Sequence, residues 1–223
     1  MTRHESRFGI TSFIYRARRP FHPGRLADLF LKPFFCKMEK LDDDKEDEKV
    51  KKREGKREKI IRLQKIQKEA SSKQNKRTGA MGEVLRSKGF LWIATSQGVI
   101  GGWQQAGNVI RLEAESRWMC DMREMWEGTP SEELVMKDMK QPNGEEYKYA
   151  DRRQELVFIG QKMKHEVVQK VLDMCLLTDE EMALGPEGWA ETMADDDNIK
   201  LNMDYGEDEE EEEGEENETK GEN

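Results

Sequence analysis

The stretch "RFGITSFIYRARRPFHPGRLADLF", residues 7–30, decides the fold because its apolar pattern changes partway along. Apolar side chains lie on both faces of the alternating segment 8–16, which predicts a strand covered at least partly on both sides. These side chains are Phe8, Ile10, Phe13, Ile14 and Tyr15. His22 then precedes Pro23, a favourable first position of a helix, and an i, i+3, i+4 apolar stripe follows until Pro33. The stretch therefore predicts a strand followed by a helix.

The remaining apolar segments extend this pattern. Residues 85–95, 101–115 and 152–160 predict three further strands, and Gly107 predicts a bulge or bend if 101–115 is a single strand. An apolar face over 167–176 predicts a helix, and "TDEE" at 178–181 has the spacing of a capping box that starts a short last helical turn before Gly185-Pro186. The predicted order is β-α-β-β-β-α. This order is typical of an α+β two-layer domain, with a four-stranded, mostly antiparallel sheet and helices on one face.

Three polar segments lie outside the predicted core. Residues 42–77 are charged throughout, with only a thin apolar stripe, and predict a helical or disordered insertion. Residues 204–223 are polyacidic and predict a disordered tail, and residues 128–150 predict a loop. The domain is therefore expected to comprise residues 1–41 and 78–200.

Composition limits the class of protein. The chain has 223 residues and a net charge of −9, but acidic and basic residues are segregated along it, so the net value describes no local surface. Three widely separated cysteines argue against a disulfide framework and favour a reducing compartment. No stretch approaches the roughly 18 apolar residues of a membrane helix. We expect a cytoplasmic protein without a membrane partner, although an organelle or the nucleus fits the same observations.

Five blocks of the sequence resemble the C-terminal domain of the CobW family, in the same order. They are "FGITSFIYRARRPFHPGRL", "VLRSKGFLWIAT", "GGWQQAGNVIRLEAE", "DRRQELVFIGQKM" and "LDMCLLTDEEMALGP". Together they span roughly half of the chain, close to all of the predicted core. The resemblance implies a domain that follows a P-loop GTPase domain in metallochaperones or insertases. The activities associated with this family are zinc delivery and the cobalt chemistry of cobalamin synthesis or nitrile hydratase activation.

The chain departs from the full-length family in two motifs. It has no G-x-x-x-x-G-K-[ST] sequence, in which backbone amides surround the phosphates while the Lys and hydroxyl reach phosphate and magnesium. The family's C-x-C-C metal motif is also missing. We therefore expect no GTPase activity and no cofactor on this chain, and zinc or cobalt with GTP-magnesium is implied only for a full-length member. The implied partners are a CobW-type GTPase domain, upstream in cis or in trans, and a metalloprotein client.

The chain offers few metal ligands. Zinc sites need four converging ligands, usually in closely spaced pairs, and the histidines and cysteines here form no such pair. His22, within "RPFHP", is a weak metal candidate, and its alternative role is local hydrogen bonding at the helix entry. Cys36 and Cys175 are predicted to be buried thiols, whereas Cys120 lies in a less regular segment.

Arginines surround the predicted strand-to-helix turn. Arg16, Arg18, Arg19 and Arg25 are candidates for contact with an acidic partner or the GTPase domain, because guanidinium groups suit carboxylates and phosphates. The alternative is a solvated rim with local ion pairs. Asp151, Arg152 and Arg153 present the same choice, with interstrand pairing as the alternative.

The basic part of the insertion could bind phosphates, but it lacks the interleaved aromatic residues of a base-stacking surface. We therefore do not expect nucleic acid to be a partner. The acidic tail can instead fold back on this basic segment as a loose, salt-sensitive clamp.

Two functions are compatible with the sequence. One is a recognition and coupling module of a metallochaperone GTPase, and the other is a stand-alone interaction protein. Met1 falls immediately before the first recognisable block, where a GTPase domain would end, so we expect that the sequence can be a fragment or a truncated gene product.

Overall fold

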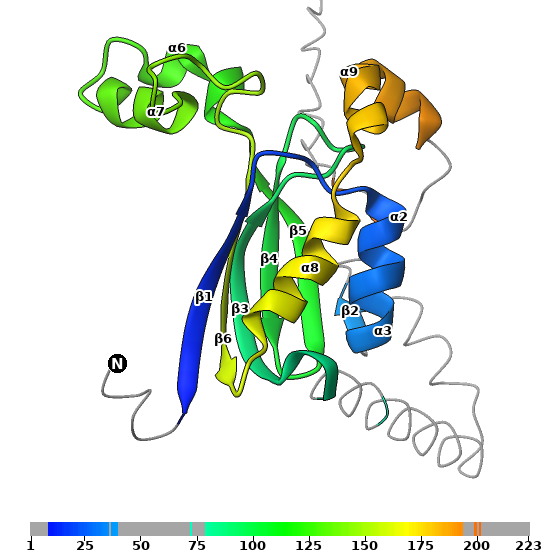
Figure 1. The fold of residues 1–223 in the computed structure, drawn as a ribbon. Helices are drawn as coiled ribbons and strands as arrows, with labels where there is room; N and C mark the ends of the chain where they lie inside the picture. The colour runs from blue at the N-terminus through cyan, green and yellow to red at the C-terminus, as the bar shows by residue number, and fades with distance from the viewer. Residues whose placement is uncertain are drawn as a thin grey trace, which may run out of the picture.

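A computed structural model describes residues 9–35, 37–39, 72, 79–193, 199 and 201. A sheet with the strand order β1-β6-β3-β4-β5-β2 carries helices on one face (Figure 1). The strands are β1 Ile10–Ala17, β2 Lys37–Glu39, β3 Glu83–Leu91, β4 Ile100–Ala106, β5 Val109–Ser116 and β6 Gln154–Gln161. The predicted α+β class and the two layers are confirmed. The predicted number of four strands is wrong, since the described residues form six.

One of the additional strands comes from residues 101–115, which form a hairpin rather than one strand. β4 and β5 pair antiparallel through a turn at Gly107 and Asn108. Gly107 has a φ of +57°, and a glycine with positive φ at the first position of a two-residue turn matches the right-handed twist of the flanking strands. The other additional strand, β2, is three residues long and pairs parallel to β5.

The first strand pairs with the last one. β1 and β6 are antiparallel, with Phe13 opposite Phe158, although these residues are 145 positions apart in the sequence. β6 also pairs antiparallel with β3, which pairs with β4. The end of β1, the end of β3 and the beginning of β6 consequently meet at one end of the sheet.

The helical layer begins directly after β1. Residues 23–34 form one continuous helical segment that comprises α2 Pro23–Arg25, the wider π-helical η1 Leu26–Leu31 and α3 Lys32–Phe34. The expectation that Pro33 ends this helix is wrong by one residue. The N–H of Lys32 bonds to the carbonyl of Ala27 in the wide π geometry, so the helix accommodates a proline near its end.

The second half of this layer follows β6. α8 His165–Cys175 packs beside the first helical segment on the same face of the sheet (Figure 1). The capping box at Thr178 and Glu181 is confirmed and starts α9 Asp179–Thr192. α9 is longer than the expected short turn, because the chain kinks at Gly185, with a φ of +70°, and then resumes a helix.

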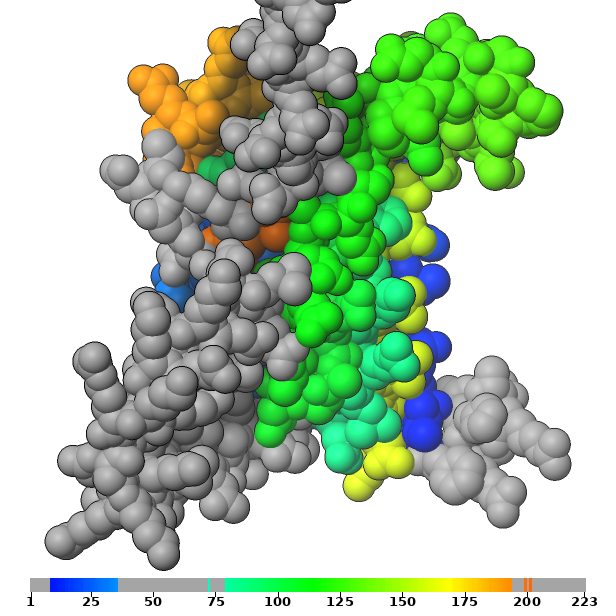
Figure 2. All heavy atoms as spheres, turned by 180° about the vertical axis from the view of Figure 1, so that it is seen from behind, coloured from blue at the N-terminus to red at the C-terminus, as the bar shows by residue number. Residues whose placement is uncertain are grey.

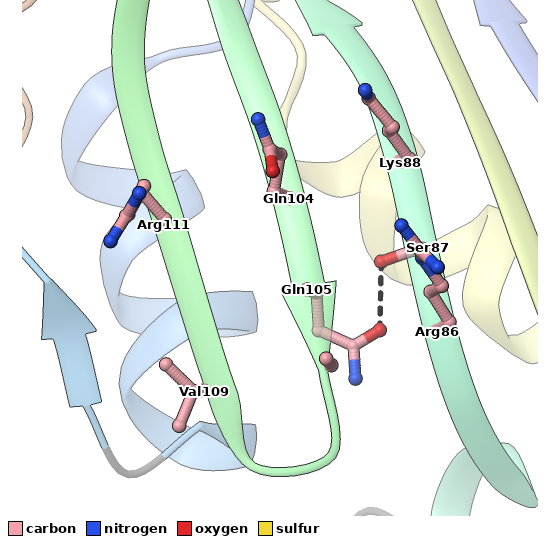
Figure 3. Close-up of a pocket in the computed structure, with 8 residues that line it drawn as sticks. Arg86, Ser87, Lys88, Gln104, Gln105, Val109 and Arg111 are labelled. Carbon is pink, nitrogen blue, oxygen red and sulfur yellow. Dashed lines mark hydrogen bonds between the residues drawn. The ribbon is translucent and has the colours of Figure 1, made fainter.

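Two apolar clusters hold the layers together. The larger one lies between sheet and helices, where the ring of Phe30 is 5.6 Å from Trp103 and 6.5 Å from Phe158. Within it, the indole N–H of Trp103 donates to Ser87 Oγ. Ser87 Oγ donates in turn to Gln105 Oε1 (Figure 3), so this buried hydroxyl is satisfied. The smaller cluster centres on Trp92 and Trp189 beneath α9.

The segment between β5 and β6 projects from the end of the sheet (Figure 1). It contains η2 Met119–Asp121, α6 Arg123–Trp126 and α7 Glu132–Met139. The prediction of a loop over residues 128–150 is therefore wrong where α7 forms. α7 buries only Met139, so its weak apolar stripe gave little periodicity to detect.

The opposite face of the sheet displays side chains of β1, β3, β5 and β6 in the view from behind (Figure 2). The predicted insertion at 42–77 and the tail at 204–223 lie outside the described residues, apart from Ser72. In the part of the chain that is described, no helix has the length and apolar character needed to cross a bilayer.

Candidate functional site

The arginine-rich turn, which we define as residues 16–25, is a joint between three elements. The backbone of Phe21 donates to the carbonyl of Trp92 at 2.9 Å and accepts from the N–H of Ala94 at 3.0 Å. On the other side, the N–H of His22 donates to Cys175, and Pro20 accepts from Leu177. The turn thereby connects the end of β3 to the α8–α9 junction, and the Phe21 side chain is completely buried between them.

The side chain of Gln154, in β6, forms hydrogen bonds to this joint from the side of the sheet. Its side chain is fully buried, with Oε1 accepting from the N–H of Trp92 at 2.9 Å. Its Nε2 donates to the carbonyls of Arg19 at 2.9 Å and Trp92 at 2.7 Å. One amide therefore satisfies backbone groups of two segments. The sequence prediction missed this residue, although a polar residue that shares a strand face with Leu156 and Phe158 was a visible signal.

The four candidate arginines separate into two pairs. Arg19 and Arg25 hold the α8–α9 junction. Arg19 donates to the carbonyl of Leu177 and to Asp179, whereas Arg25 donates to the carbonyl of Leu176 and bonds both carboxylate oxygens of Glu181 at 2.8 and 2.5 Å. This bidentate geometry is the strong form of an arginine–carboxylate pair.

Arg16 and Arg18 line a polar cavity of about 640 Å³ together with Tyr147 and Arg153. Arg18 donates to the carbonyls of Ala150 and Asp138 and stacks over the ring of Tyr147, 3.9 Å from its centroid. It thereby attaches the projecting segment to the sheet. Arg16 pairs with Glu155 at 3.2 Å, and 60% of its side chain is exposed. Contact of the four arginines with a partner stays a prediction.

Glu181 is the acidic centre of the α8–α9 junction. Hydrogen bonds from Arg25 and from the N–H of Thr178 lower the pKa of Glu181 from the ordinary 4.5 to about 2. A carboxyl whose folded pKa is depressed contributes stability above its unfolded pKa, and this contribution is lost as pH falls toward the folded pKa. The contribution of Glu181 to stability is therefore lost as the pH falls from 4.5 to about 2.

Replacement of Glu181 by Gln should therefore lower the free energy of unfolding at pH 7 by about 1–2 kcal/mol. It should also remove the part of the acid destabilisation that belongs to this window. Denaturant unfolding of both proteins from pH 7 to pH 2.5 measures the effect, with the exposed neighbour Glu180→Gln as the matched control. Parallel pH profiles of Glu181→Gln and wild type would contradict the assignment.

His22 caps the first helix. Its Nδ1 accepts from the N–H groups of Gly24 and Arg25 at 3.2 and 3.4 Å. This is the local hydrogen-bonding role weighed against a metal site. In the described part of the chain, no group of three His, Cys, Asp or Glu side chains converges in a way that suits a metal ion. Cys175 is buried as predicted, and Cys36 lies outside the described residues.

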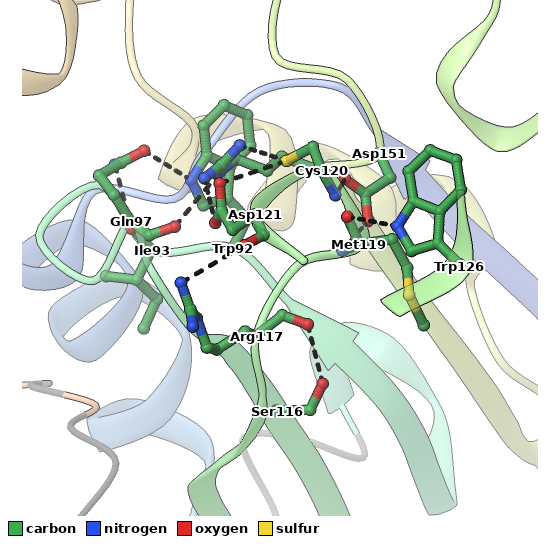
Figure 4. A network of polar contacts seen from close by, with 11 residues as sticks. Trp92, Ile93, Gln97, Ser116, Arg117, Met119, Cys120, Asp121, Trp126 and Asp151 are labelled. Carbon is green, nitrogen blue, oxygen red and sulfur yellow. Dashed lines mark hydrogen bonds and ion pairs between the residues drawn. The ribbon is translucent and has the colours of Figure 1, made fainter. Parts of the chain in front are cut away.

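A second polar network ties the projecting segment to the loop after β3 (Figure 4). The buried carboxylate of Asp151 accepts from the N–H groups of Met119 and Cys120. Arg152 donates to Cys120 Sγ at 2.7 Å, to Asp121 at 2.6 Å and to the carbonyl of Gln97 at 3.2 Å. Burial and the hydrogen bond with Asp151 raise the pKa of Cys120 to about 12, which disfavours the thiolate at neutral pH.

Residues 58–176 match the family described as the cobalamin synthesis protein cobW C-terminal domain. The chain belongs to this family. The match covers more than half of the sequence and runs from the insertion through β6 to the end of α8, so the cobW C-terminal domain accounts for most of the described sheet.

A curated relative aligns with most of the chain. The chain is 32% identical over 184 residues to the "Zinc-regulated GTPase metalloprotein activator 1" of Dictyostelium discoideum. The alignment covers 82% of this chain and 28% of the relative, so the chain spans less than a third of the length of that protein.

Two solved structures are also similar. They are the zinc-bound YjiA GTPase of E. coli and a zinc-bound triple mutant of YjiA GTPase, each with a TM-score of 0.38 at 11% identity. They cover 78% and 75% of this chain, and 32% and 30% of their own lengths are matched.

Proposed function

We propose that this chain is the recognition and coupling domain of a GTP-dependent metallochaperone or metal insertase, with zinc or cobalt as the cargo. The match to the cobW C-terminal domain, together with a relative named a zinc-regulated GTPase metalloprotein activator, carries the proposal. The chain itself does not hydrolyse GTP, because its sequence lacks the phosphate-binding loop. It contacts a GTPase domain and a metalloprotein client.

In this proposal the arginine-rich turn has two tasks. Arg18, Arg19 and Arg25 fix the turn through bonds to backbone carbonyls, so their role is to hold the joint. Arg16 projects from the sheet, and its exposed ion pair with Glu155 is worth little by itself. Arg16 can therefore exchange Glu155 for a carboxylate of the partner at little cost to the fold.

Binding to a GTPase domain in trans tests the proposal. The probe is the part of the Dictyostelium relative that this chain does not match, and the relative's own matched segment is the positive control. Titration calorimetry should give this chain a dissociation constant within about tenfold of that control. Arg16→Glu should weaken binding about fivefold or more, because a like charge opposes the partner carboxylate.

The matched control is Lys170→Glu, an equal charge reversal at an exposed position of α8 in the helical layer, which should leave binding unchanged. The proposal fails if the relative's own segment binds its GTPase part and this chain does not. Equal effects of the two charge reversals would remove Arg16 from the interface.

A further inference from the structure

β1 is an outer strand of the sheet. In the strand order of the described residues it has one neighbour, β6, and the two strands pair continuously from Ile10 to Ala17. Figure 1 shows β1 at the margin of the sheet, with α8 toward the interior. Because the backbone groups of a strand point alternately to its two sides, every second residue of β1 directs its N–H and C=O away from β6.

β1 lacks the features that usually prevent an outer strand from pairing with another chain. Such strands are commonly short, interrupted by a bulge, or provided with Pro or Lys. The sequence of β1, ITSFIYRA, contains neither Pro nor Lys, and its register with β6 shows no bulge. β2, the outer strand on the other side of the described sheet, has only three residues, and two of them, Lys37 and Glu39, are charged. Strand addition is therefore expected at β1 and not at β2.

The side chains of β1 give this edge an apolar character. Phe13 faces the helical layer, where its ring stacks on Phe158 at 5.2 Å. Ile14 lies on the opposite face and is 48% exposed. The adjacent strand adds Ile159, which lies opposite Ser12 on that face and is 38% exposed. An extended segment beside β1 would cover part of this apolar surface.

A second copy of β1 fits the geometry of an antiparallel partner. Residues directly opposite each other in an antiparallel pair share a face and a hydrogen-bonding direction, so a two-fold axis between identical strands passes through a residue and not between two. An axis at Phe13 pairs the whole segment 10–16 with itself. It places Ser12 of each copy opposite Ile14 of the other, and the two exposed Ile14 side chains become diagonal neighbours.

The charges of β1 permit this self-pairing. Arg16 is the only charged residue of the strand, and an axis at Phe13 places it opposite Ile10 of the second copy. The two Arg16 residues are then about 20 Å apart along the strands, which exceeds the Debye length of about 8 Å at physiological salt. We propose that two copies of this chain associate through β1 about a two-fold axis at Phe13, which joins their sheets into one continuous sheet.

Sedimentation equilibrium of the full chain tests the proposal. Pairing of two short edge strands buries less surface than the roughly 1,200 Å² of a standard stable interface, so we expect a weak dimer with a dissociation constant of about 10–100 µM. Ile14→Lys should raise this constant about tenfold or more, because it brings two lysines together across the axis in place of two isoleucines.

Ile159→Lys is the matched control. It introduces the same charge at an exposed isoleucine of the same face, but in β6, one strand away from the edge. A lysine at this position is about 10 Å from the nearest strand of the second copy, so it should change the dissociation constant by less than about twofold. A dimer that Ile14→Lys leaves unchanged, or that both variants weaken equally, would overturn the proposal.

Two further measurements distinguish this contact from other associations. Amide hydrogen exchange of the peptide that contains residues 10–17 should slow as the wild-type concentration rises from about 5 to 500 µM, and it should not slow in Ile14→Lys. About 0.5 M salt should leave the dimer intact, because the contact contains no ion pair, whereas association of the acidic segment 204–223 with the basic insertion of another copy would be lost. A wild-type chain that is monomeric at about 1 mM would also overturn the proposal.

Discussion

Replacing Gln154 with leucine is expected to lower the free energy of unfolding by about 2–4 kcal/mol. Leucine fills a similar volume, but it leaves the N–H of Trp92 and the carbonyl of Arg19 without their buried partner. A buried backbone group that loses its hydrogen bond destabilises the folded state by its full desolvation free energy. The effect is large because one amide joins the arginine-rich turn to the end of β3.

Urea unfolding measures this change. Gln169→Leu is the matched control, because Gln169 is exposed on α8, and it should change the unfolding free energy by less than about 0.5 kcal/mol. Gln154→Glu should be at least as damaging as the leucine variant, since a carboxylate would face two carbonyl oxygens. A Gln154→Leu protein as stable as the control would show that the amide does not hold the joint.

Replacing Gly89 with alanine should destabilise the sheet by about 3 kcal/mol or more. Gly89 lies in β3, has a φ of +154° and is opposite both Trp103 of β4 and Leu156 of β6. A Cβ at this position would lie 2.0 Å from the carbonyl oxygen of Glu155, a backbone atom that cannot move without shifting β6. Both the backbone conformation and the close approach of the strands require glycine.

Gly98→Ala is the control for this substitution. A Cβ at Gly98 has no neighbour within 4 Å, and the residue needs no positive φ, so the change should stay within about 0.5 kcal/mol. Thermal and urea unfolding of the two variants measure the difference. Similar stabilities would mean that β3 and β6 are further apart than the structure indicates.

Local patterns predicted the elements that depend on local chemistry. The strand at 8–16, the helix entry at His22-Pro23, the apolar face of α8 and the Thr178 capping box are all present in the structure. Each rests on residues within a few positions of one another, so periodicity or capping chemistry reveals it.

The missed elements depend on contacts between distant segments. β2 has three residues and forms a strand only because β5 lies beside it. α7 buries one residue, so it has no clear apolar periodicity. The strand order also places β1 beside β6 across most of the sequence, and no local pattern specifies that pairing.

The candidate site was predictable in part. The arginines and His22 were visible in the sequence, but their partners were not, because the α8–α9 junction and the projecting segment come from residues more than a hundred positions away. Gln154 has no conspicuous motif, and its role appears only when the end of β3 and the turn meet around it.

The most direct test of the proposed coupling role is to purify the native protein from its source and determine its intact mass and bound proteins. The account predicts a P-loop GTPase domain, either in the same polypeptide or associated with it in a stoichiometric complex. A native chain of 26.1 kDa that carries no GTPase partner under gentle, low-salt isolation would contradict it.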